Sequence, residues 1–111
     1  MSKPYIHIQE ALARKVPGKM SFELLGEENG CLSGCRSGIT VNDSEEYGAA
    51  GVHEDQEGFF VLEGEGYVML DDMEIEVREG SSFIALPGVK HTMRTKDKSK
   101  PLKIFWFHSA V

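Results

Sequence analysis

From Met20 onward, apolar and polar residues alternate with a period of two, and turn-forming residues interrupt the alternation at short intervals. Met20, Phe22 and Leu24, for example, alternate with polar neighbours, which is typical of a strand with one buried face. Glycine-containing turn signals recur about every eight to twelve residues, which leaves room for about eight short strands. The pattern predicts an all-β barrel or sandwich with almost no helix.

The second half of the chain carries the clearest strand and turn signals. Residues 59–62 form a continuous apolar run, which is typical of a strand that is buried on both faces. Asp71-Asp72 lies between two alternating segments and predicts a two-residue hairpin loop. Further strands are predicted at residues 67–70, 73–77, 83–86, 91–95 and 102–108, with one or two more within 31–41.

The first 19 residues are predicted to form an extension in front of a barrel at residues 20–108. Within the extension, four residues recur at helical spacing: Ile8, Ala11, Leu12 and Lys15. This spacing predicts a short helix at residues 9–15, which Pro17-Gly18 would end. No linker or repeat divides the chain, so residues 1–111 are interpreted as a single domain.

Composition and charge exclude several classes of protein. The 111 residues are 41% hydrophobic and 27% charged, as in an ordinary soluble domain. A net charge of −6 argues against binding to nucleic acids or anionic membranes, because both require a basic surface. No apolar run approaches the ~20 residues of a membrane helix. Residues 1–19 also lack the apolar core of a signal peptide, so a cytoplasmic location is predicted.

The two cysteines, Cys31 and Cys35, are interpreted as reduced thiols in or near a strand, because thiols stay reduced in the cytosol. Their C-x3-C spacing differs from the C-x2-C spacing of zinc ribbons and thioredoxin-like sites, and the chain has no second pair. A metal-binding or redox pair is the alternative interpretation.

Two imidazoles and one carboxylate lie at the ends of predicted strands, namely His53, Glu57 and His91. Together they offer a divalent metal three ligands and leave part of its coordination sphere open. On a straight strand, His53 and Glu57 would lie about 13 Å apart, whereas a metal needs both donors about 2 Å from itself. The chain must therefore reverse between them, and residues 54–56 are polar enough to turn. His91 follows a Pro-Gly turn and could enter from another strand.

Residues 48–108 resemble the cupin superfamily, whose first motif is G-x5-H-x-H-x3–4-E-x6-G. His53, Glu57 and Gly64 match its second histidine, its glutamate and its final glycine. The resemblance implies a double-stranded β-helix, also called a jelly-roll barrel. It also implies a divalent metal ion, such as Fe, Zn, Mn or Ni, in the mouth of that barrel.

The second cupin motif, G-x5-P-x-G-x2-H-x3-N, is matched less completely. Gly80, Gly88 and His91 fall on its glycines and its histidine. Pro87 lies one position late, and Thr95 stands where the motif has asparagine. The resemblance thus implies His53, Glu57 and His91 as the metal ligands.

The first motif departs from the family at one ligand, because its first histidine falls on Gly51. Water or substrate is expected to fill this vacancy. His7 and His108 are alternative replacements for the missing ligand, and Asp55 or Gln56 could also reach inward. A cupin that has lost its metal altogether is a further alternative.

Seven aromatic residues could fill the barrel, form an interface or line a pocket for an apolar ligand: Phe59, Phe60, Tyr67, Phe83, Phe105, Trp106 and Phe107. Residues 105–107 are consecutive, so their side chains should face opposite sides of a strand. One side should be the barrel interior, and the other needs cover. This two-sided apolar strand predicts a homodimer.

The resemblance leaves two kinds of function open. One is a metal-dependent enzyme acting on a small organic substrate, of the dioxygenase, isomerase or lyase type. The other is a non-catalytic module that binds or senses a small molecule in the same barrel, with or without metal. Beyond the metal ligands no general base or nucleophile stands out, and Tyr67 and Glu54 are the remaining candidates.

Overall fold

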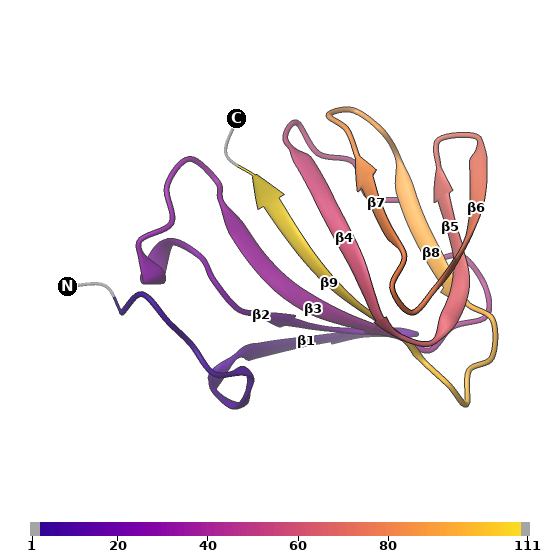
Figure 1. Cartoon of the computed structure of the whole chain (residues 1–111), viewed down its shortest axis with the longest axis horizontal. Helices are drawn as coiled ribbons and strands as arrows, with labels where there is room; N and C mark the ends of the chain where they lie inside the picture. The colour runs from indigo at the N-terminus through magenta and orange to yellow at the C-terminus, as the bar shows by residue number, and fades with distance from the viewer. Residues whose placement is uncertain (1–2, 110–111) are drawn as a thin grey trace.

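A computed structural model describes residues 3–109, whose strands form two antiparallel sheets (Figure 1). The larger sheet has six strands in the order β1 (Leu12–Val16), β2 (Lys19–Glu23), β3 (Arg36–Asn42), β9 (Leu102–Ser109), β4 (Gln56–Glu63) and β7 (Ser82–Ala85). The smaller sheet has three strands in the order β6 (Met73–Arg78), β5 (Glu65–Leu70) and β8 (His91–Thr95). The prediction of an all-β jelly-roll architecture is confirmed.

The predicted helix at residues 9–15 is wrong. Ile8–Glu10 forms a single 3-10 turn, η1, and the chain then continues as strand β1. Seven residues are too few to form a stable helix alone. Pairing with β2 satisfies their backbone groups instead, through a hairpin in which Gly18 has φ +79°. Residues 12–16 of the predicted extension therefore lie in the sheet as its edge strand.

The predicted turns connect the strands as expected. Asp71 has φ +51° in the two-residue loop between β5 and β6, so the predicted hairpin is confirmed. Gly64 has φ +90° between β4 and β5, and an added Cβ there would lie 2.5 Å from the carbonyl oxygen of Pro101. Of the one or two strands predicted within residues 31–41, the structure has one, β3. Within the described residues, no helix is long and apolar enough to cross a membrane.

The core lies between the two sheets. Its buried members are Phe59, Val61, Val68, Val77, Ala85, Leu102 and Ile104. In β4, Phe59 and Val61 point inward and are almost fully buried, whereas Phe60 between them is 44% exposed. The prediction that residues 59–62 are buried on both faces is therefore wrong, because no second layer covers the outer face of this strand within the described residues.

Strand β9 lies between β3 and β4 at the centre of the larger sheet, as Figure 1 shows. Trp106 packs against the core, and its indole nitrogen donates to the Thr40 hydroxyl at 3.0 Å. Only glycine fits opposite it, because a Cβ at Gly38 would lie 2.2 Å from the indole ring. Phe105 and Phe107 point to the outer face. The strand thus has the two-sided apolar character that the sequence predicted.

The two cysteines lie in the loop that precedes β3, and both are free. Ser33 and Gly34 both have positive φ angles, so this loop turns tightly between Cys31 and Cys35. Both cysteines thus lie near a strand, as expected, and their reduced state stays a prediction.

Candidate metal centre

Three histidines from separate parts of the chain meet at Glu57, at one end of the barrel. Glu57 is the second residue of β4, and His108 on β9 is its direct partner in the sheet. His91 begins β8, and His53 lies in the segment before β4. The backbone bends at residues 54–55, which is the reversal required to bring His53 back towards Glu57.

The ring nitrogens of these histidines face the two oxygens of the Glu57 carboxylate. His53 Nε2 and His91 Nε2 lie 3.4 and 3.2 Å from Oε1, and His108 Nε2 lies 3.4 Å from Oε2. The side chains of Glu57, His91 and His108 are at most 10% exposed, and that of His53 is 36% exposed. One ligand atom from each of His53, Glu57 and His108 lies within 4.8 Å of the others. His91 contacts the same carboxylate from just outside this tight set.

A hydrogen bond on the far side of the His108 ring favours one position for its proton. His108 Nδ1 lies 2.9 Å from Asp55 Oδ2, whereas His91 Nδ1 approaches the carbonyl oxygen of Val89 only to 3.5 Å. A carboxylate oxygen only accepts, so Nδ1 of His108 donates. In a neutral His108 ring, Nε2 then carries the lone pair and directs it towards Glu57. Several donor atoms therefore point at one place, as in a metal site.

Burial and hydrogen bonding shift two pKa values around the cluster. Loss of solvent lowers the pKa of His53 and outweighs the attraction of Glu57, which favours the neutral, ligating form of the ring. Partial burial alone would raise the pKa of Asp55. The hydrogen bond from His108 and the nearby charges of His108, His53 and Arg36 together outweigh burial, so this pKa is lowered and the carboxylate stays ionised.

Gly51 lies beside the cluster, at the position where the first motif has a histidine. It forms an antiparallel bridge with His91, in which each backbone N–H donates to the other carbonyl at 2.8 Å. An added Cβ would lie 3.3 Å from His91 Nε2 and 3.8 Å from His53 Nε2. A side chain at this position would therefore enter the site, and glycine leaves that space free.

Arg36 borders the cluster at the start of β3, opposite His108. Its Nη2 lies 3.4 Å from His108 Nε2, and the residue is exposed. Among the described residues no carboxylate lies within ion-pair distance of its guanidinium group. Sequence reasoning missed Arg36, because its nearness to His108 depends on the register of β3 against β9, which no local pattern shows.

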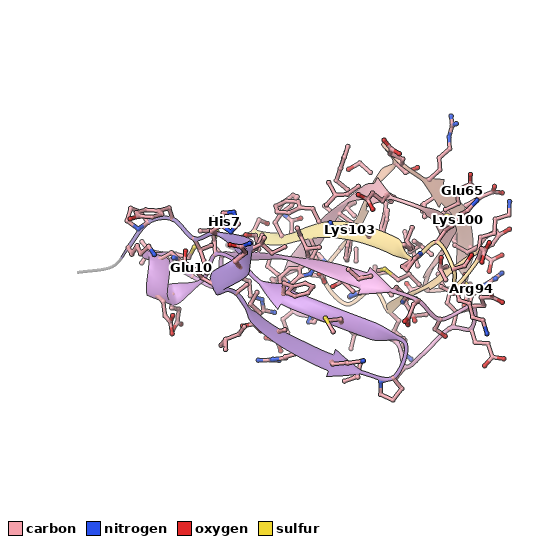
Figure 2. The ribbon with its side chains drawn as sticks, turned by 90° about the horizontal axis from the view of Figure 1, so that it is seen from below. His7, Glu10, Glu65, Arg94, Lys100 and Lys103 are labelled. Atoms are coloured by element: carbon pink, nitrogen blue, oxygen red, sulfur yellow. The ribbon has the colours of Figure 1, made fainter. Side chains whose placement is uncertain are left out.

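Apart from Asp55, the other sequence candidates make their side-chain contacts outside the cluster. His7 caps η1, with its Nδ1 accepting from the Gln9 backbone, and Figure 2 shows it beside Glu10 in the N-terminal segment. Gln56 donates to Ser109 at 2.8 Å, and Tyr67 lies under the Arg94 guanidinium at 4.1 Å. Asp55 reaches His108 but none of the cluster's other side chains at a recorded hydrogen-bond distance. Of the suggested replacements, the structure thus brings His108 to the site and leaves His7 outside it.

Comparison with known proteins identifies the type of domain. The sequence profile of the cupin domain matches residues 39–108. A search among curated protein sequences returns no match. The matched residues run from β3 to the end of the site on β9, so they include all four residues of the cluster.

Solved structures with a similar fold include several enzymes. Hydroxypropylphosphonic acid epoxidase from S. wedmorenis matches with a TM-score of 0.83 and 17% identity over 95% of this chain, which spans 58% of the epoxidase. An RmlC-like cupin from Shewanella frigidimarina NCIMB 400 matches with a TM-score of 0.77 and 19% identity, over 98% of this chain and 93% of that one. A mutant of Bacillus subtilis oxalate decarboxylase OxdC gives 0.85 and 14%, over 99% of this chain and 30% of the enzyme. At these identities the likeness establishes the fold alone.

Proposed function

This chain belongs to the cupin family, and we propose that His53, Glu57 and His91 bind one divalent metal ion at the mouth of its barrel. One observation carries this function: His53 Nε2 and His91 Nε2 converge on the same oxygen of Glu57, at 3.4 and 3.2 Å. Two imidazoles and a carboxylate suit Fe(II), Zn(II), Mn(II) or Ni(II) and leave coordination positions open. A small organic ligand takes those positions.

We further propose that the protein is a metal-dependent enzyme of the dioxygenase, isomerase or lyase type. A bound metal of this kind polarises an oxygen atom of its ligand or, as Fe(II), supports oxygen chemistry. The chain itself positions the ligands by strand pairing and excludes water on one side, where Phe59 packs 5.7 Å from the His91 ring. The epoxidase and decarboxylase among the similar structures support an enzymatic role.

A second candidate is a non-catalytic module that binds or senses a small molecule. The observation that favours it is that, apart from Asp55, whose carboxylate His108 already holds at 2.9 Å, no separate acid or base lies at the cluster within the described residues. Tyr67 lies under Arg94 on the outside of β5, and Glu54 is exposed without a recorded side-chain partner. Chemistry that needs a dedicated proton-transfer group would have to obtain it from the ligand or from the cluster itself.

The position of Arg36 supports an organic ligand that carries an anionic group. Its guanidinium lies beside the cluster, is exposed and has no ion-pair partner among the described residues. Guanidinium groups bind carboxylate and phosphonate oxygens through two parallel hydrogen bonds. A ligand with one oxygen on the metal and an acidic group on Arg36 would satisfy both charges.

We also propose that two copies of the chain form a homodimer through the outer face of β7, β4 and β9. Ile84, Phe60 and Phe107 on this face are 45%, 44% and 44% exposed. The Phe107 ring lies over Gly58, so the strands form one continuous apolar surface. β7 is also an unpaired edge of the sheet. Analytical ultracentrifugation should give a dimer for the wild type and a monomer for Phe60→Glu, and a monomeric wild type would contradict the interface.

Calorimetric titration tests the metal site. Fe(II), Mn(II), Ni(II) and Zn(II) are titrated into chelator-stripped wild type, His91→Ala and Glu57→Ala, with His7→Asn as the control histidine variant. The wild type and His7→Asn should bind one ion with the same affinity, and both site variants should lose at least about 100-fold in affinity. Equal binding by all four proteins would exclude these residues as ligands.

An activity screen separates the enzyme from the binding module. Metal-loaded protein is incubated with small carboxylates and phosphonates, with and without oxygen, beside the Glu57→Ala variant. Turnover that the variant lacks supports the enzyme. Binding of the same compounds without turnover, measured by calorimetry, supports the module.

A further inference from the structure

The C-terminal end of β9 brings a third histidine, His108, to the carboxylate of the proposed metal site. Building on that proposed function, we propose that His108 is a fourth protein ligand and that Asp55 positions it. The coordination position left for an outside ligand then faces Gly51. This chain would have moved one ligand from the segment before β4 to the last strand, while keeping the number of ligands at four.

The geometry of His108 meets the demands on a ligand. Its side chain is 3% exposed, and its Nε2 lies 3.4 Å from Glu57 Oε2. The antiparallel register of β4 and β9 places the two residues directly opposite each other, so backbone hydrogen bonds fix their separation. His108 also belongs, with His53 and Glu57, to the set whose ligand atoms lie within 4.8 Å of one another. This spacing allows all three donors to reach one ion placed between them.

The partners of the neutral His108 ring favour a cation between it and Glu57. Asp55 accepts from Nδ1 at 2.9 Å, so Nε2 of the neutral ring carries a lone pair. That lone pair faces a carboxylate oxygen, which also only accepts. Two buried acceptors at 3.4 Å repel each other unless a cation lies between them. A carboxylate that holds the opposite nitrogen of a ligating histidine is also the usual outer partner in metal sites.

Arg36 does not remove this mismatch. Its Nη2 approaches His108 Nε2 only to 3.4 Å, which is longer than the usual N–H···N or N–H···O hydrogen bond. The donor comes from an exposed side chain with freedom to move, so a metal ion can displace it. The competing arrangement is a protonated His108 ring shared by Asp55 and Glu57, and it makes a different prediction for the ring nitrogens.

The vacancy at Gly51 lies elsewhere around the same carboxylate. A Cβ at Gly51 approaches the Nε2 atoms of His91 and His53, at 3.3 and 3.8 Å, and no atom of His108 is among its three nearest contacts. His53 and His91 approach Oε1 of Glu57, whereas His108 approaches Oε2. His108 therefore occupies a different direction from the one that Gly51 leaves free.

Long-range nitrogen–proton correlation spectra of the histidine rings test this ligand set directly. The probe is Zn(II), added in equal amount to chelator-stripped, nitrogen-15-labelled wild-type protein. We expect the Nε2 resonances of His53, His91 and His108 to shift on binding, and that of His7 to stay unchanged. In metal-free protein, a neutral His108 ring should show one protonated nitrogen, at Nδ1, whereas the competing arrangement would show two.

The outcomes separate this inference from the metal site itself. If Zn(II) binds and shifts only His53 and His91, His108 is not a ligand and the three-residue site stands. If His108 shifts and His91 does not, the fourth ligand stands and the three-residue site is wrong. If the wild type binds no Zn(II), both fail. Because the wild type is measured, a folding defect in a variant cannot produce any of these results.

Variants measure the size of the contribution. His108→Ala should weaken Zn(II) binding on the order of 100-fold, and Asp55→Asn should weaken it by about 10- to 100-fold by releasing the ring. An His108→Gln variant, with unchanged circular dichroism, controls for loss of packing. Unchanged affinity in His108→Ala and His108→Gln would overturn the assignment of His108, and unchanged affinity in Asp55→Asn would overturn its positioning role.

The open position is tested by filling it. Co(II)-loaded wild type should bind azide, with a change in its visible absorption bands. Gly51→His should retain Co(II) and lose the azide response, because the new imidazole takes the free position. Azide binding of equal strength in both proteins would place the open position away from Gly51.

Discussion

The buried polar groups at the two ends of the barrel differ in their hydrogen-bond partners. At the end away from the cluster, Thr95 is fully buried, and its hydroxyl lies 3.2 to 3.4 Å from the carbonyl oxygens of Glu65, Asp97 and Lys100. Figure 2 shows Glu65 and Lys100 close together at that end. A donor there meets acceptors. At the mouth, the oxygens of Glu57 lie 3.2 to 3.4 Å from the Nε2 atoms of three histidines, which carry lone pairs in the proposed ligand set.

The difference shows at which end the buried polar groups are hydrogen-bonded within the chain itself. The buried hydroxyl at the far end has its partners within the chain, as buried polar groups in stable folds do. In the proposed ligand set the facing rings are neutral, so the carboxylate at the mouth has no strong donor, and its burial costs stability in the absence of a cation. Substitutions that remove a polar group should therefore lower stability at the far end and leave it unchanged, or raise it, at the mouth.

The largest expected effect is the increase in stability when a metal ion binds at the mouth of the barrel. Zn(II) at about 1,000 times its dissociation constant should raise the free energy of unfolding of the wild type by about 4 kcal/mol. Glu57→Gln should lose this increment while its metal-free form stays at least as stable as the wild type, because a glutamine amide can donate to a ring nitrogen. Urea unfolding with and without Zn(II) measures both quantities. A large loss of metal-free stability in Glu57→Gln would show that the mouth, too, is complete by itself.

The next effect belongs to the far end. Thr95→Val keeps the shape of the side chain and removes the hydroxyl, so it should lower the free energy of unfolding by about 1–3 kcal/mol. Thr92→Val on the same strand is the matched control, because its hydroxyl makes a single contact of 3.3 Å and is more exposed. It should change stability by less than about 0.5 kcal/mol. Metal affinity should not change in Thr95→Val. A lower metal affinity in this variant would show that the two ends of the barrel are energetically coupled.

A smaller effect is expected from substituting Arg36, which should change the affinity of the mouth for an anionic ligand. Arg36→Gln should weaken the binding of a carboxylate such as acetate to the metal-loaded protein by about tenfold, or about 1.4 kcal/mol. Calorimetry with acetate and with an uncharged alcohol measures this change, and only acetate should respond. An equal loss for both compounds would mean that Arg36 supports the site itself.

The smallest effect concerns protons at the mouth. Ligation requires neutral imidazoles, so metal affinity should fall as the pH falls towards the ~6.5 of free histidine, by about threefold or less per half unit for each ring. Burial lowers the pKa of His53, so this ring stays neutral to a lower pH than free histidine and contributes little to the loss. Zn(II) titrations at a series of pH values measure the slope. If His53 contributes little, the slope should stay nearly the same in an His53→Ala variant, and a clearly flatter slope would contradict this expectation.

Strand pairing explains why the sequence was informative about some features and silent about others. Alternation and turn residues are local, so they predicted the strands, the Asp71 hairpin and the reversal between His53 and Glu57. The same local spacing misled at residues 9–15, where contacts with β2 decide the structure. Which residues face each other across β9 depends on register, so no local pattern could place Arg36 and Asp55 beside His108. The homodimer, the single-domain boundaries and the cytoplasmic location stay predictions.

The bridge between Gly51 and His91 has a consequence for how such a barrel can diversify. In the proposed ligand set, the loop at residues 43–51 supplies no donor to the metal, and it meets the site at Gly51 through a pair of backbone hydrogen bonds that does not depend on the side chains of residues 43–50. Insertions and substitutions in this loop can therefore reshape the entrance without removing the metal. Ligand selectivity and metal retention can then change independently during evolution, because the loop determines the first and the paired strands mainly determine the second.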